Sequence, residues 1–84
     1  MKTIEVKIYN LYKSIKINIE ENDTINNVKR KICKEIDGAF NKIRLYPLEN
    51  DKIKTGYSFY GLNGDISFNN NYSEYNNFIV LLIL

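Results

Sequence analysis

The chain lacks histidine and tryptophan and has a single cysteine, Cys33, among its 84 residues. One cysteine cannot form an internal disulfide, and without histidine no set of soft zinc ligands is present. The side chain that most often acts as a general base near neutral pH is also missing. We therefore expect no metal, no cofactor and no enzymatic activity, and we expect Cys33 to be a partly buried structural thiol in a cytoplasmic protein.

Long hydrophobic runs are also lacking. The longest, FIVLLIL at 78–84, is far shorter than the roughly 20 residues that cross a bilayer as a helix. The first ten residues alternate in polarity, unlike a signal peptide, so we expect neither export nor a membrane span. The net charge of +2 is too small to argue for nucleic acid, and the 44% hydrophobic content fits one globular domain over residues 1–84.

Two early segments, 4–8 and 15–19, alternate strictly between apolar and polar residues. This period of two is typical of strands with one buried face. The short link at 9–14 predicts an antiparallel hairpin that presents one apolar face and one polar face. Another element must cover the apolar face.

A helix that could cover this face follows. Ile25, Val28 and Ile32 recur at spacings of three and four residues, which places them on one helical side. Thr24 is suited to cap the N-terminus through its hydroxyl group, and Gly38 is the expected stop.

A third strand is predicted over 42–48, where Pro47 suggests that pairing is brief. The pattern weakens over 49–77, with strand fragments expected at 57–60 and 66–68 and a surface loop at the asparagines 69–71. The wholly apolar run at 78–84 favours a central strand.

The segment DTINNVKRKI at 23–32 and the pair Arg44-Leu45 resemble the corresponding parts of ubiquitin, and the resemblance covers about the first 48 residues. It implies an α+β, ubiquitin-like β-grasp fold with a mixed four- to five-stranded sheet packed on one main helix. In that fold the last strand runs parallel to the first in the centre of the sheet.

The chain departs from conjugating members of that family, because it ends Leu82-Ile83-Leu84 instead of a flexible tail with two glycines. We therefore expect non-covalent action. Two non-conjugating groups are similar: the Hub-type splicing-associated proteins, which lack the diglycine, and the small ubiquitin-like component of bacterial type VII secretion systems, which has about this length.

The candidate site is the sheet face that the helix leaves open. If Ile43 and Leu45 face the helix, Arg44 and Tyr46 face solvent. The last strand is apolar on both of its faces, so some of its large aliphatic side chains must also face outward. The expected protein-binding residues are Leu11, Arg44, Tyr46, Leu48, Ile79 and Leu81. Tyr46 aligns with the central isoleucine of the ubiquitin patch, and the alternative is that the late loop covers this patch.

These features predict a protein-interaction module or adaptor whose partner is another protein. The second hypothesis is an accessory subunit of a larger apparatus that self-associates through the same patch. Other clusters have plainer explanations: Glu20, Glu21 and Asp23 suit a helix N-terminus, and the basic helix side at 29–34 is an ordinary solvated surface. Gly61 to Gly64 is explained by a turn.

Overall fold

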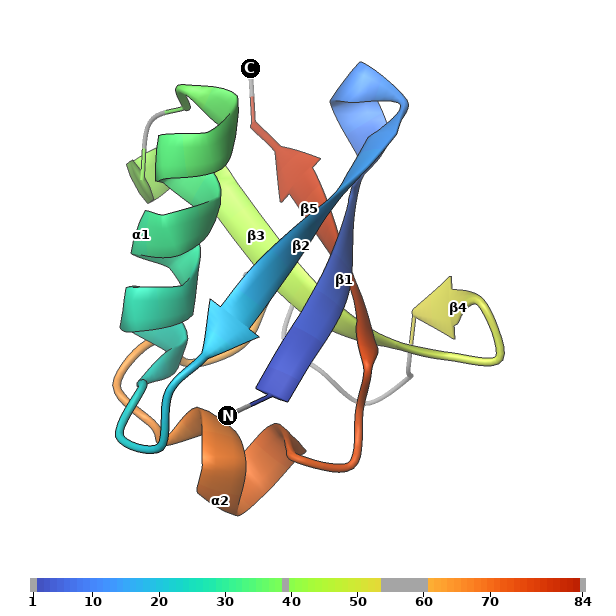
Figure 1. The fold of residues 1–84 in the computed structure, drawn as a ribbon. Helices are drawn as coiled ribbons and strands as arrows, with labels where there is room; N and C mark the ends of the chain where they lie inside the picture. Colours follow the sequence, from blue (N-terminus) through green and yellow to red (C-terminus); the bar gives the residue numbers. More distant parts are fainter. Residues whose placement is uncertain (1, 39, 54–60, 84) are drawn as a thin grey trace.

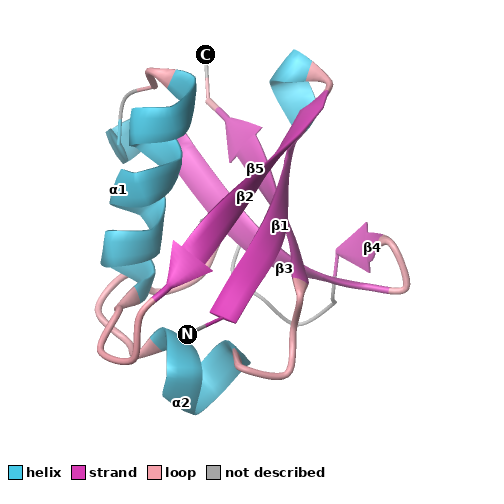
Figure 2. Ribbon diagram, viewed as in Figure 1, coloured by secondary structure: helices cyan, strands magenta, loops and turns pink. Residues whose placement is uncertain are grey.

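The structure is a computed structural model, and it describes residues 2–38, 40–53 and 61–83. Five strands form one mixed sheet in the order β2-β1-β5-β3-β4, and one long helix packs on one of its sides (Figure 1). Figure 2 shows a much shorter helix at the opposite end from the hairpin. The elements are β1 (Lys2–Ile8), η1 (Tyr9–Leu11), β2 (Lys13–Ile19), α1 (Ile25–Ile36), η2 (Phe40–Lys42), β3 (Ile43–Glu49), β4 (Lys52–Ile53), α2 (Phe68–Tyr72) and β5 (Asn77–Leu82).

The predicted hairpin and central last strand are confirmed. β1 pairs antiparallel with β2 and places Ile4 opposite Ile17. β5 runs parallel to β1 and antiparallel to β3, so it lies in the middle of the sheet. Phe78 and Val80 on β5 are fully buried, which explains the apolar character of this segment.

The helix was predicted correctly in its position and its buried side. Ile25, Val28 and Ile32 have no exposed surface, and the Thr24 hydroxyl accepts a hydrogen bond from the Asn27 amide at 3.2 Å. The expected stop at Gly38 is displaced by one residue, because Asp37 adopts the left-handed conformation with φ 55°. Aspartate tolerates that conformation better than most non-glycine residues.

Pairing of β3 is longer than predicted, and Pro47 lies within it opposite Phe78. Leu45 has the same orientation as Pro47, and its carbonyl accepts a hydrogen bond from the Leu62 amide on the side away from β5. The position where Pro47 lacks an N–H therefore points away from β5. This orientation lets a proline sit inside a paired strand.

The segment after Gly61 fastens the N-terminal end of α1. The Ile25 amide donates to the Ile66 carbonyl at 3.0 Å and the Asn26 amide to the Gly64 carbonyl at 2.8 Å. These bonds satisfy amide groups that a helix start leaves without intrahelical partners.

One prediction for the late segment is wrong, and another is confirmed only in part. The asparagine run, expected as a surface loop, forms most of α2. Of the strand fragment expected at 66–68, Ser67 forms an isolated antiparallel bridge with Thr24, and α2 already begins at Phe68. Ser67 accepts from the Asn70 amide, and Asn71 donates to the Ser67 carbonyl. Phe68 and Tyr72, four residues apart, are buried and give this short helix its apolar side. The fragment expected at 57–60 lies outside the described residues.

Candidate functional site

The sheet face opposite α1 carries a continuous row of side chains from four strands. Lys7 on β1 lies beside Ser14 on β2 and Ile79 on β5, and Ile79 lies beside Tyr46 on β3. Side chains on neighbouring strands in such register are direct neighbours on one face. The row is therefore polar on the hairpin strands β1 and β2 and aromatic on β3.

Four of the six predicted site residues lie where the sequence placed them. Ile79 and Leu81 are half-buried on this outer face, and Arg44, also half-buried, is the register partner of Leu81. Leu11 lies in η1 and is 45% exposed. Phe78 and Val80 of β5 face the core, so the residues that alternate with them face outward.

The predicted exposure of Tyr46 and Leu48 is wrong. Their side chains are only 7% and 8% exposed, although neither belongs to the core cluster that packs against α1. Strand alternation identifies the face of a side chain, but it does not reveal what covers that face. Leu48 pairs with Ile53 of β4, an element that the sequence did not indicate. The β3 side of the outer face is therefore mostly closed.

The most exposed aromatic side chains among the described residues lie instead at the hairpin, where Tyr9 is 58% and Tyr12 91% exposed, while Phe40 in η2 is 38% exposed. The ring centroids of Tyr9 and Tyr12 are 6.5 Å apart, with the planes tilted by 35°. Sequence reasoning treated these residues only as a turn. One signal in the sequence could have indicated this exposure. The link between the two strands contains two tyrosines, and the apolar face of the hairpin is complete without them.

Several contacts hold the hairpin tip in one shape. Residues of η1 form a 3-10 turn, and Tyr12 follows in the left-handed conformation with φ 51°. The Tyr12 amide donates to the Tyr9 carbonyl at 3.3 Å. The Leu82 amide donates to the Asn10 side-chain oxygen at 2.8 Å, which ties the turn to the end of β5. Both rings are thus presented from a fastened backbone.

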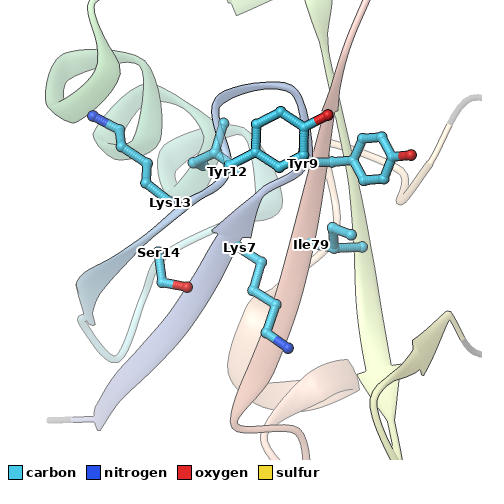
Figure 3. A pocket seen from close by; sticks show the side chains of 7 residues that line it. Lys7, Tyr9, Tyr12, Lys13, Ser14 and Ile79 are labelled. Carbon is cyan, nitrogen blue, oxygen red and sulfur yellow. The ribbon is translucent and has the colours of Figure 1, made fainter.

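Beneath the rings lies an open concavity of about 290 Å³. Figure 3 shows the rings of Tyr9 and Tyr12 extending from the hairpin over β5 on the side of Ile79, while Lys7 extends away from them. We call this concavity and its lining the hairpin patch. Its residues are Lys7, Ile8, Tyr9, Tyr12, Lys13, Ser14 and Ile79.

One residue of the acidic cluster before α1, Asp23, has a structural role. Asp23 is 5% exposed, and its carboxylate accepts from the Glu20 amide at 2.8 Å and from the Lys31 ammonium at 2.5 Å. Lys31 also donates to the Asn18 carbonyl. This network joins the end of β2 to α1. Carboxylate hydrogen bonds of this kind compensate the burial of the charge.

Cys33 is partly buried on α1. Burial raises the pKa of its thiol, and a backbone hydrogen bond and the nearby Lys29 charge oppose that effect only in part. Because the thiolate is the reactive form, a raised pKa lowers nucleophilicity near neutral pH. Within residues 2–38, 40–53 and 61–83, no three acidic or cysteine side chains gather as metal ligands would.

Comparison with known proteins gives no family for this chain. No protein-family model matches it, and no curated protein matches it either. In the part of the chain that the structure describes, no helix has the length and apolar character needed to cross a membrane. We therefore infer the function from the residues of the site.

Proposed function

We propose that this chain is a non-conjugating, ubiquitin-like module with a β-grasp fold that binds a protein partner non-covalently. Support for the fold comes from the strand order β2-β1-β5-β3-β4 with one main helix. Further support comes from the resemblance of residues 23–32 to ubiquitin.

The observation that carries the functional proposal is the exposure of large apolar side chains at one end of the outer sheet face. Tyr9, Leu11 and Tyr12 are all exposed, and the two tyrosines line one concavity with the half-buried Ile79 of β5. Isolated exposed apolar residues are ordinary, but a gathered set on a monomer usually marks an interaction site. Tyrosine is also enriched among the residues that dominate binding free energy at interfaces.

The proposed binding surface differs from the one expected from sequence. Tyr46 and Leu48 are buried, so their substitution tests folding before it tests binding. The surface retained for recognition comprises the hairpin patch together with Leu11 and Leu81. Figure 1 places this end of the sheet opposite α2.

The test is a quantitative pull-down from lysate of the native host, comparing the parent chain with Tyr12→Asp. Tyr12 is almost fully exposed, so the variant should fold, which circular dichroism checks first. We expect at least one specific partner to be lost from Tyr12→Asp and retained by the control Lys34→Gln, which alters an exposed position on α1. An identical partner list for all three chains contradicts the proposal.

A further inference from the structure

The size of the hairpin patch limits what it can hold. Its concavity of about 290 Å³ lies at the lower end of the roughly 300–1,000 Å³ typical of small-molecule sites. It is also open to solvent, not enclosed, and Figure 3 shows its labelled lining side chains. Such a shape suits one or two side chains projecting from a partner chain better than an enclosed cofactor.

The charges of the patch identify the sign of the partner. Lys7 and Lys13 line the concavity, and none of its described lining residues carries a carboxylate. The Lys7 ammonium lies 3.7 Å from a carboxylate oxygen of Asp51, whose side chain is 87% exposed. A long, exposed ion pair of this kind is weak and readily replaced. An incoming carboxylate can therefore take the place of Asp51.

The apolar part of the patch is adjacent to Lys7, whereas the Lys13 side chain extends to the other side of the hairpin (Figure 3). Ile79 is the direct register neighbour of Lys7, and the two tyrosine rings extend over the same strand (Figure 3). An apolar side chain placed against Ile79 and the rings would thus bring neighbouring residues of the same ligand close to Lys7. One short peptide segment can satisfy both features.

We infer that the hairpin patch binds an acidic peptide segment of a partner protein. An aliphatic or aromatic side chain of the segment packs on Ile79 and the rings of Tyr9 and Tyr12. A carboxylate one or two residues away pairs with Lys7. This inference rests on the proposed function and adds the chemistry of the partner.

Charge argues against a second copy of the chain as the occupant. A two-fold interface places the same patch on both sides, so each copy would offer the other lining lysines and, among the described lining residues, no carboxylate to pair with them. Like charges so opposed are unfavourable. Two lining lysines also fall short of the concentrated basic groove that accompanies aromatic stacking in single-stranded nucleic-acid sites.

The test is an NMR titration of the full chain with two synthetic peptides, Glu-Leu-Asp-Phe-Glu-Leu and its uncharged counterpart Gln-Leu-Asn-Phe-Gln-Leu. We expect the acidic peptide to shift the backbone amide signals of Lys7, Tyr12 and Ile79, and to bind about tenfold more tightly than the uncharged one. The Lys7→Gln variant should remove this preference, whereas Tyr12→Ala should weaken both peptides. Lys34→Gln, distant from the patch, should behave as the parent chain.

Equal affinity for the two peptides would overturn the inference that the partner segment is acidic, and it would leave the proposed function standing. Shifts confined to another surface, or none at about 1 mM acidic peptide, would overturn the inference as well. A concentration-dependent dimer that Tyr12→Ala dissociates, measured by analytical ultracentrifugation, would identify a second copy as the occupant. Failure of the proposed function is recognised separately, by an unchanged partner list in the pull-down.

Discussion

Two pairs of tyrosines lie at opposite ends of the molecule and have almost the same internal geometry. Tyr9 and Tyr12 have ring centroids 6.5 Å apart, and Tyr72 and Tyr75 have centroids 6.4 Å apart. In each pair the second tyrosine follows the first by three positions in the chain. The first pair is exposed at the hairpin, whereas Tyr72 and Tyr75 are 7% and 8% exposed and belong to the core.

The difference comes from what surrounds each pair. Phe68 and Phe78, with centroids 5.4 Å apart, extend the aromatic group at the α2 end, and Tyr75 meets Phe78 edge-on at 6.3 Å. At the hairpin the rings extend over β5 beside Ile79, which is only half-buried (Figure 3). One aromatic pair therefore contributes to folding, and the other is available for recognition.

The largest expected effect is at the α2 end. Phe68 is fully buried in the core, so Phe68→Ala should leave a cavity and lower the free energy of unfolding by about 3–5 kcal/mol. Tyr12→Ala should change it by less than about 0.5 kcal/mol, as exposed substitutions usually do. Urea denaturation measures both values. Similar losses in the two variants would break the contrast between the ends.

A smaller effect is expected where the hairpin is fastened to β5. Asn10→Ala removes the acceptor of the Leu82 amide, and one such hydrogen bond contributes about 0.5–1.5 kcal/mol. The turn should also become less ordered, because this bond ties its side chains to the sheet. Urea denaturation measures the loss of stability, and the NMR order parameters of Tyr9 and Tyr12 measure the ordering. Unchanged order parameters would show that other contacts suffice.

The smallest effect concerns alkaline pH. Burial, followed by the proximity of Tyr75, raises the pKa of Tyr72 above its ordinary value. The folded state therefore holds the phenolic proton more tightly than the unfolded state. This contribution to stability is complete below the unfolded pKa of about 10 and is lost as pH rises through the folded pKa.

The measurement is the free energy of unfolding in urea on either side of pH 10. We expect Tyr72→Phe to lose less stability than the parent chain over that range, because phenylalanine has no proton to release. Equal losses in the two proteins would remove Tyr72 as a cause of alkaline destabilisation.

Much of the fold could be predicted because local patterns coincide with the final burial. The alternation in β1 and β2 and the spacing of Ile25, Val28 and Ile32 each reflect one buried side. The late segment was different. Its hydrogen bonds join residues far apart in the chain, such as the Phe68 amide with the Asp23 carbonyl, and α2 contains only five residues. Neither feature leaves a periodic signal.

The candidate site was predicted in part for a similar reason. Alternation placed Ile79 and Leu81 on the outer face correctly, but it gave no information on the burial of Tyr46. The exposure of Tyr12 depends on the left-handed turn and on the bond between Asn10 and Leu82. That bond joins residues 72 positions apart, so it could not be read from the local sequence.

The most direct test of which part of the outer face is free is urea denaturation of the pair Tyr12→Asp and Tyr46→Asp. Both variants introduce the same charge for the same ring on the same side of the molecule. With Tyr12 91% and Tyr46 7% exposed, we predict an unchanged unfolding midpoint for Tyr12→Asp and a severely lowered one for Tyr46→Asp. A stable Tyr46→Asp protein, or an equally destabilised Tyr12→Asp protein, would contradict the account and return the candidate surface to β3.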